Sequence, residues 1–184
     1  IYSLYGLVSE GLFQSEAEIE AHSDQSGLGG PVAPGDIKYK DVDGNGVINN
    51  DDREYLGPYF PELTYGLNFT AKYKDFDLVL FLQGAGRVKS YVNSRALGSL
   101  YDINGQPTSI WWDRWTPSNP DATFPRVWNS YTQNNPENRA SSYWVRDADY
   151  LRLKNLQIGY TLPKKISNNL GLRNARIFLT GNNL

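Results

Sequence analysis

The chain has 184 residues and a formal charge of −2, which gives no overall electrostatic basis for binding nucleic acid or anionic lipid. It has no cysteine and one histidine, so disulfides and thiolate metal sites are excluded and a histidine-cluster site is not expected. No apolar run approaches the roughly 20 residues of a membrane helix, and no signal peptide is evident. Because the chain starts at Ile1, lacks methionine and ends in a strand-like segment, we expect an internal piece of a longer polypeptide.

The first predicted element is a short helix. Ser15 and Glu18 stand at the spacing of a capping box, in which Ser15 is the N-cap and Glu18 the third helical residue. The pattern predicts a helix that ends near His22. A loop rich in Gly and Pro follows over residues 27–35.

An acidic loop, "KDVDGNGVINNDD", covers residues 40–52 and resembles the twelve-position calcium loop. Gly46 falls at the turn position, and position 12 holds an Asp where Glu is usual, which predicts a weak site. The extended "GDIKYK" before it argues against a sensor-type helix pair. The alternative is an Asx-rich turn held by its own side-chain hydrogen bonds; if calcium binds, we expect a structural role. The candidate ligands are Asp41, Asp43, Asn45, Val47 (through its carbonyl), Asn49 and Asp52.

Residues 64–73 alternate without a break and predict a strand. Their number matches the roughly 9–11 residues that a tilted strand needs to cross a bilayer. A tight turn at Lys74-Asp75 and a second strand over residues 76–84 complete a hairpin. The predicted apolar face of the first strand consists of Tyr65, Leu67, Phe69, Ala71 and Tyr73.

Residues 85–148 are predicted to be a long connection, because "NGQP", "TPSNPD" and "NNPEN" interrupt any period. Strand patterns return at residues 150–162 and 175–184, joined by a shorter connection. The alternation slips near Lys154, which predicts either a bulge or a segment that stands clear of a membrane.

Short turns, one very long loop and two-faced strands are typical of outer-membrane barrels. Aromatic residues near both strand ends would suit two interfacial girdles. The same alternation is also expected of a soluble β-sandwich, in which one sheet face is core and the other meets solvent. From alternation alone the two architectures remain open.

The run "PGDIKYKDVDGNGVINNDDREYLGPYFPELTYGLNFTAKYKDFDLVLFLQGAG" resembles the C-terminal part of the SusC/RagA family of TonB-dependent outer-membrane transporters. "GLVSEGLFQSEAEI", "WWDRWTPSNPDATFPR" and "SYWVRDADYLRLKNLQIGYTLPKKI" through "ARIFLTGNNL" match in the same order, so the resemblance covers nearly the whole chain. It implies an all-β fold, part of a large antiparallel transmembrane barrel of about 22 strands with long extracellular loops. It also implies that the plug domain lies outside residues 1–184.

The resemblance implies TonB-energised uptake of glycans or oligosaccharides in the outer membrane, together with a SusD-like surface lipoprotein. Some members resemble peptide importers, so the cargo class stays open. The TonB complex would act through the missing N-terminal region, outer-membrane lipid would surround the strands, and no nucleic acid is expected. With the Lys74-Asp75 turn in the periplasm, the extracellular loops are residues 9–62 and 85–148, and the hairpins are residues 64–84 and 150–184.

All five tryptophans lie in the second long loop. Such rings can form a platform on which sugars stack, or the small core that a loop of this length needs; we favour the core. The candidate ligand-binding residues are Trp111, Trp112, Trp115 and Trp128.

We do not expect an enzyme. Asp147 and Asp149 are spaced to share a strand face, and paired carboxylates can hydrolyse glycosides. However, Arg146 and Arg152 offer them simple ion pairs, and no nucleophile or zinc motif accompanies them. The alternative to a transporter is a soluble extracellular β-domain that binds carbohydrate and is stabilised by calcium.

Overall fold

The computed structural model describes residues 3–92, 108–127 and 139–184. The chain divides into two compact units. We call Ile1–Phe60 with Lys89–Asp147 the loop unit, and Pro61–Val88 with Ala148–Leu184 the sheet unit. Among the described residues, no helix is both long enough and apolar enough to cross a membrane.

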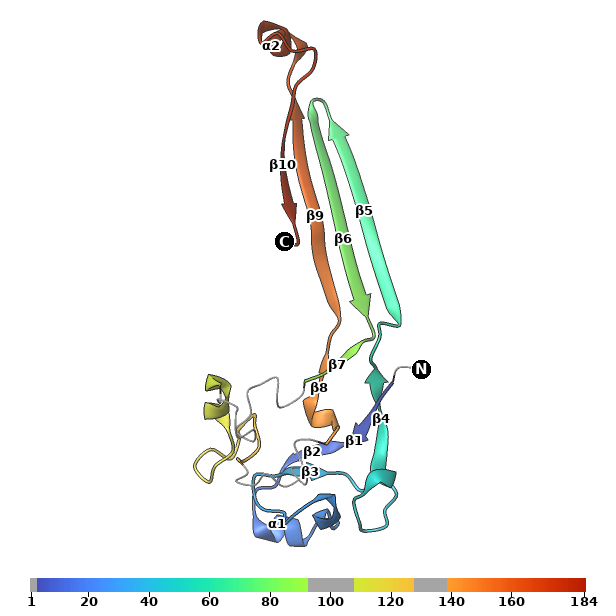
Figure 1. Ribbon diagram of the computed structural model, residues 1–184, viewed down its shortest axis with the longest axis vertical. Helices are drawn as coiled ribbons and strands as arrows, with labels where there is room; N and C mark the ends of the chain where they lie inside the picture. Colours follow the sequence, from blue (N-terminus) through green and yellow to red (C-terminus); the bar gives the residue numbers. More distant parts are fainter. Residues whose placement is uncertain (1–2, 93–107, 128–138) are drawn as a thin grey trace. The chain divides into compact units, whose positions relative to one another are not determined.

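The sheet unit is one antiparallel sheet of four strands in the order β10-β9-β6-β5 (Figure 1). Strands β5 and β6 form the predicted first hairpin, and β9 and β10 form the second, so the predicted strands are confirmed. The bounds are β5 Leu63–Tyr73, β6 Phe76–Gly86, β9 Tyr150–Thr161 and β10 Arg176–Asn182. The hairpins also pair with each other through β6 and β9.

The register divides the sheet into one apolar and one polar face, because residues paired across antiparallel strands point to the same side. Leu67 pairs with Leu82, and Phe69 with Leu80. One row crosses all four strands with apolar side chains throughout: Ala71, Leu78, Ile158 and Leu179.

The slip in alternation near Lys154 is a β-bulge. Phe81 pairs with Asn155 and the next residue, Leu82, pairs with Leu153, which leaves Lys154 as the extra residue. The bulge returns Leu151 and Leu153 to the apolar face, opposite Gly84 and Leu82. Of the two predicted explanations for the slip, the bulge is therefore correct.

The two short connections of the sheet unit differ. Tyr73 pairs with Phe76, so Lys74-Asp75 forms the predicted tight turn, in which Lys74 has a positive φ of 53°. The connection between β9 and β10 contains a helix, α2 (Lys164–Asn169), which the sequence pattern did not predict. The Ser167 hydroxyl donates to the carbonyls of Leu162 and Pro163 and fixes the helix to the end of β9.

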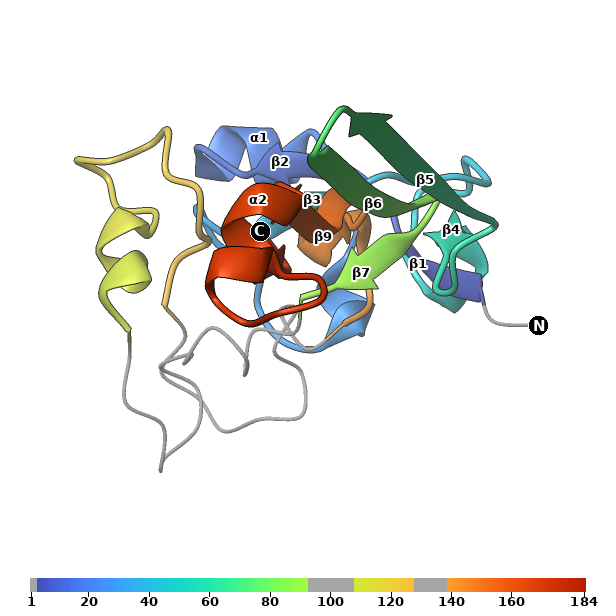
Figure 2. The same ribbon diagram turned by 90° about the horizontal axis from the view of Figure 1, so that it is seen from above.

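The loop unit is built from short strand pairs. Strand β1 (Ser3–Leu7) pairs with β4 (Arg53–Pro58), and the two lie side by side in both ribbon views (Figures 1 and 2). Strand β2 (Ser9–Leu12) pairs with β3 (Ile37–Tyr39), and β7 (Lys89–Tyr91) pairs with β8 (Val145–Asp147). Residues 9–62 and 85–148, predicted to be loops, therefore contain short strands. The one-turn helices are η1 (Ser26–Leu28), η2 (Asn50–Asp52), η4 (Ser109–Asp113) and η6 (Ser142–Trp144).

A small hydrophobic core holds these pieces together. Its members come from six separate segments, so burial of apolar area rather than extended strand pairing stabilises the unit. The buried members are Leu7, Leu28, Ile37, Tyr39, Ile48, Trp111 and Trp144.

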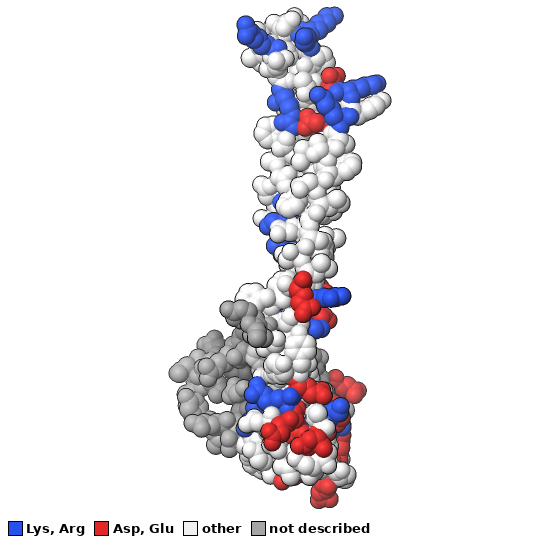
Figure 3. Space-filling view, turned by 90° about the vertical axis from the view of Figure 1, so that its right-hand side faces the viewer, with Lys and Arg blue, Asp and Glu red and all other residues white. Residues whose placement is uncertain are grey.

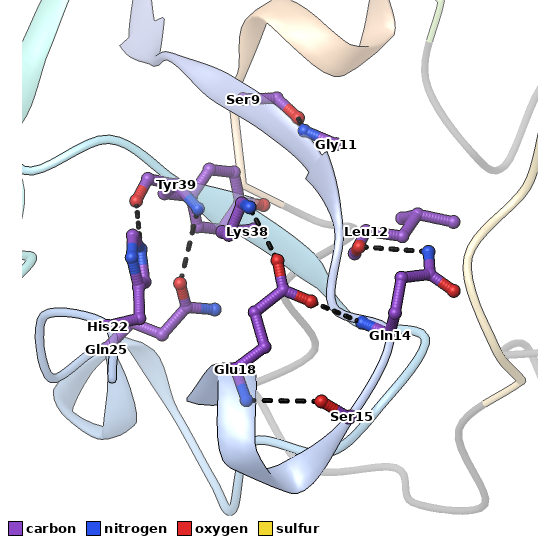
Figure 4. Close-up of polar contacts among 10 residues, drawn as sticks. All are labelled: Ser9, Gly11, Leu12, Gln14, Ser15, Glu18, His22, Gln25, Lys38 and Tyr39. Carbon is purple, nitrogen blue, oxygen red and sulfur yellow. Dashed lines mark hydrogen bonds and ion pairs between the residues drawn. The ribbon is translucent and has the colours of Figure 1, made fainter. Parts of the chain in front are cut away.

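Helix α1 (Glu16–Glu20) forms where the capping pattern predicts it. The Ser15 hydroxyl accepts from the Glu18 backbone N–H (Figure 4). The Glu18 carboxylate does not close the reciprocal half of the box. It accepts instead from the Gln14 backbone N–H at 2.7 Å and from the Lys38 ammonium at 2.7 Å, which ties α1 to β3.

Candidate functional site

The apolar face of the sheet forms a band without charged side chains across all four strands, while Arg152, Lys154 and Asp77 lie on or beside the opposite face. The band consists of Tyr65, Leu67, Phe69, Ala71 and Tyr73 on β5, Phe76, Leu78, Leu80, Leu82 and Gly84 on β6, Leu151, Leu153, Leu156, Ile158 and Tyr160 on β9, and Ile177, Leu179 and Gly181 on β10. On the face in Figure 3, charged atoms of the sheet gather near its two ends and most of the length between is uncharged. An uncharged band across all strands matches the hydrocarbon-spanning part of a membrane barrel.

The apolar face of this band is open. Leu67 is 58% exposed, Phe69 50% and Leu179 77%, so the described residues do not cover them. A soluble sandwich would need a second sheet here. The outer strands β5 and β10 also have one unpaired edge each among the described residues, which further strands of a barrel would satisfy.

The opposite face carries the polar side chains of the sheet, together with Val79, Phe81 and Phe178. The Asn155 amide donates to Asn182 at 2.8 Å across β9 and β10. Nearer the α2 end, the Arg176 guanidinium forms an ion pair with Asp77 directly over Gly159. Sequence reasoning missed this cluster, although a glycine within a long strand signals a close approach by a neighbouring group.

The acidic loop brings three carboxylates together. One oxygen each of Asp41, Asp43 and Asp52 lies within 4.8 Å of the others. Asp52 is completely buried, whereas Asp43 is exposed. In the described part of the chain none of the three forms an ion pair with a basic side chain, so their negative charges are not neutralised there.

Backbone N–H groups of the loop already point at these carboxylates. Asp41 accepts from Gly44 and Gly46, both at 2.8 Å, and Asp52 accepts from Val42 at 2.8 Å. The Ser23 hydroxyl donates to Asp41 and, with the backbone donors, holds the pKa of that carboxyl below its usual value.

The glycine and the two asparagines of the calcium-loop pattern also have defined conformations or contacts. Gly46 has a φ of 86°, as the sharp turn at that position requires. The Asn45 side chain accepts from the Val47 N–H, and the Asn49 side chain caps η2 by accepting from Asp51. The residue types and the converging carboxylates fit a hard cation with oxygen ligands, while the same contacts constitute the alternative Asx-rich turn.

The aromatic residues of the second loop divide by burial. Trp111 is 2% exposed and packs against Phe124, so its ring belongs to the core and cannot serve as the stacking surface considered above. Trp112 is 82% exposed and offers a free ring. Trp115 is half-buried; its indole N–H donates to Gln14 and its ring lies over Gly35. Trp128 lies outside the described residues.

The acidic pair considered for catalysis has other partners. Asp147 forms an ion pair with Lys89, not with the adjacent arginines. Asp149 accepts from the backbone N–H of Val88 at 3.0 Å. Arg146 donates to the carbonyls of Tyr143 and Val145. Both carboxylates thus have structural partners among the described residues.

Comparisons with known proteins agree on one class. No family model matches the chain. It is 35% identical over 176 residues to TonB-dependent receptor P26 of Formosa agariphila, covering 95% of this chain and 17% of that protein. It is 33% identical over 190 residues to TonB-dependent receptor P3 of the same organism, covering 100% of this chain and 17% of that protein. The chain therefore spans about a sixth of the length of these relatives.

Solved structures with a similar fold are RagAB complexes. One is described as the RagAB peptide transporter and aligns with a TM-score of 0.67 and 18% identity, over 99% of this chain and 18% of that one. Another, the RagAB peptide importer in an open-open state, aligns with a TM-score of 0.64 and 17% identity, over 98% of this chain and 18% of that one. At these identities the alignment establishes the fold alone, which is part of a large antiparallel β-barrel.

Proposed function

This chain belongs to the TonB-dependent receptor family, and we propose that it supplies part of the membrane wall and external loops of an outer-membrane nutrient importer. The carrying observation is the uncharged band, whose apolar face stays exposed over four paired strands. Burying such a face in lipid stabilises the sheet, whereas exposing it to water would not. In this proposal TonB energises transport through the part of the protein that precedes this chain.

We propose that the cargo consists of glycans or oligosaccharides, delivered with a SusD-like surface lipoprotein. Support comes from the polar face of the sheet, where the central rows carry hydroxyls and neutral amides such as Asn68, Thr70, Gln157 and Thr180, alongside Val79 and Phe81. Exposed Trp112 offers a ring on which a sugar could stack. The RagAB complexes, by contrast, are described as peptide transporters, so peptides are the alternative cargo.

Uptake by the full-length protein tests both the proposed import function and the proposed cargo. Cells with and without the intact gene are supplied with labelled oligosaccharides or labelled peptides, with and without a protonophore that removes the energy for TonB. We expect gene-dependent, protonophore-sensitive uptake of oligosaccharides. Uptake of peptides alone would contradict the cargo, and unchanged uptake of both classes on deletion would contradict the importer.

Trp112→Ala refines the same assay. Because Trp112 is exposed, we expect the protein to assemble normally while oligosaccharide uptake falls by about fivefold or more, the loss of one aromatic contact. The matched variant Trp111→Ala removes a core ring, so it should instead lower the amount of assembled protein. If Trp112→Ala and the wild type take up equal amounts of oligosaccharide per assembled molecule, Trp112 does not bind the cargo.

We further propose that the acidic loop binds calcium as a structural ion. The support is the convergence of Asp41, Asp43 and Asp52 without a basic partner in the described residues. Position 12 is an Asp, so the expected Kd is in the range of about 10⁻⁴–10⁻³ M that serves extracellular modules. Ile48, inside the loop, is fully buried in the core, so an ion would stabilise the fold of this unit.

A further inference from the structure

The apolar face of the sheet ends at a row of aromatic side chains. Tyr73 pairs with Phe76, and Phe76 pairs with Tyr160, with the rings of the last two 4.6 Å apart. Tyr73 is 72% exposed. Aromatic rings in one row at the limit of an apolar band, two of them amphipathic tyrosines, are typical of the depth where lipid headgroups begin.

Around and beyond this row the charges are mostly positive. Residues 72–77 and 161–176 contain six basic and two acidic side chains, a local net charge of +4 in a chain whose total is −2. Figure 3 shows these basic atoms gathered at the α2 end of the sheet. The basic residues are Lys72, Lys74, Lys164, Lys165, Arg173 and Arg176.

Most of these cations are not neutralised by the protein. Arg176 is paired with Asp77 on the polar face. Lys74, Lys164, Lys165 and Arg173 are exposed and form no ion pair in the described part of the chain. The Lys74 ammonium lies 5.3 Å from the centre of the Tyr73 ring, at the edge of the apolar face.

Apolar side chains accompany the cations on α2 and the residues after it. Ile166 is 48% exposed, Leu170 62% and Leu172 47%, without covering neighbours among the described residues. The segment has a fixed conformation, because Leu172 N–H donates to the Ser167 carbonyl at 2.9 Å and Leu162 N–H to Ala175 at 2.8 Å. Exposed leucines among lysines, directly beyond a lipid-facing band, are typical of a segment at a membrane interface.

We propose that α2 and the Lys74-Asp75 turn form a binding site for anionic phospholipid headgroups in the leaflet at that end of the sheet. Lys74, Lys164, Lys165 and Arg173 would contact the phosphates, while Ile166 and Leu170 enter the boundary between headgroups and acyl chains. This inference rests on the proposed membrane function. The overall negative charge of the chain does not oppose this binding, because salt largely screens charges that lie farther from the site than a Debye length of about 8–10 Å.

The test uses the full-length protein in nanodiscs of phosphatidylcholine mixed with phosphatidylglycerol. After transfer to a mild detergent, native mass spectrometry counts the lipids of each class that remain bound. We expect the wild type to retain phosphatidylglycerol preferentially. Removing three charges with Lys164→Gln/Lys165→Gln/Arg173→Gln should lower this retention by about tenfold or more.

The matched control removes three exposed charges from the loop unit, as Lys40→Gln/Arg53→Gln/Arg146→Gln, and should retain phosphatidylglycerol like the wild type. Heat-modifiable migration of the barrel verifies assembly of every variant. Should the triple variant fail to assemble, the wild type at about 0.5 M salt replaces it, because screening should release the anionic lipid.

The outcomes separate the two levels of inference. Three results would overturn the lipid site alone, provided that the protein enters nanodiscs. The wild type could retain both lipid classes equally, the triple variant could retain as much phosphatidylglycerol as the wild type, or salt could fail to release the phosphatidylglycerol. If the wild-type protein fails to insert into nanodiscs of any lipid composition, the membrane function and the lipid site are both overturned.

Discussion

The Asp77 carboxylate on β6 and the Arg176 guanidinium on β10 meet above the backbone of Gly159 on β9. The ion pair thus bridges three strands, with the Arg176 Nε donating to Asp77 at 2.9 Å. A Cβ atom at Gly159 would overlap both side chains, and Gly159 itself has no positive φ, so the space and not the backbone conformation requires glycine here.

Gly159→Ala is therefore expected to destabilise the sheet. The added methyl group must displace the Asp77–Arg176 pair, and overpacking of this kind costs about 1–3 kcal/mol. The denaturation midpoint of the full-length protein in detergent measures the effect. Gly27→Ala is the control, because a Cβ there meets no atom within 4 Å and the φ of Gly27 is not positive. Equal midpoints for Gly159→Ala and the wild type would show that the pair moves aside without cost.

Adjacent residues on β5 should respond oppositely to the same charge. Phe69 lies on the apolar face and Thr70 on the polar face. An arginine facing lipid costs about 2–4 kcal/mol near the bilayer centre and about 0–1 near its interfaces. We therefore expect Phe69→Arg to remove the full-length protein from the outer-membrane fraction, and Thr70→Arg to leave it there. Fractionation with an antibody against an external loop measures this, and normal membrane assembly of Phe69→Arg would contradict a lipid-facing position.

The long strands were predictable because each repeats its period many times. Even the bulge left a trace, since the alternation slips at Lys154. Helix α2 left no such trace in the sequence. It is short, and the side chain of its N-cap residue, Pro163, has no oxygen that could accept a backbone N–H. In the loop unit, β1 and β4 lie about 50 residues apart in the chain and span few periods, so local pattern could not pair them.

The candidate sites, too, were predictable from the sequence only in part. The calcium-loop spacing predicted which carboxylates converge, because that geometry is local to thirteen residues. Burial of tryptophan was not predictable: Trp111 and Trp112 are identical neighbours, yet one is 2% and the other 82% exposed. Only the distant segments that pack against Trp111 decide between them, and a single sequence does not reveal these contacts.

The link between α1 and β3 should make the loop unit sensitive to acid. The Lys38 ammonium, with the Gln14 N–H, lowers the pKa of Glu18 below its ordinary 4.5. A lowered pKa means that the folded state favours the charged carboxylate. The stabilisation is therefore present above pH 4.5 and is lost as the pH falls through the lowered pKa.

Glu18→Gln should thus destabilise β3 at neutral pH by up to about 1 kcal/mol, the value of a partly exposed ion pair, and the difference from the wild type should vanish in acid. Hydrogen exchange at the β3 amides, corrected for intrinsic rates, measures this difference against pH. Glu20→Gln is the control, because Glu20 is exposed and has no ion pair in the described residues. A gap between Glu18→Gln and the wild type that persists in acid would assign the effect to packing.

Calcium should stabilise the loop unit through Asp43. Asp52 is buried, whereas Asp43 is exposed and accepts from the backbone N–H and the side-chain amide of Asn45. Asp43→Ala should consequently keep the loop folded while removing one of three converging carboxylates. We expect calcium at about 1 mM to slow hydrogen exchange around Ile48 in the wild-type full-length protein and to have little effect in Asp43→Ala.

Asp51→Ala serves as the matched control for this measurement. Asp51 is an exposed acidic residue of the same loop but lies outside the converging triad, so its loss changes the net charge equally without removing a ligand. Its response to calcium should equal that of the wild type. If calcium changed exchange in all three proteins alike, it would act by screening the acidic surface; if it changed none, the carboxylates would be held by the backbone N–H groups of the loop alone.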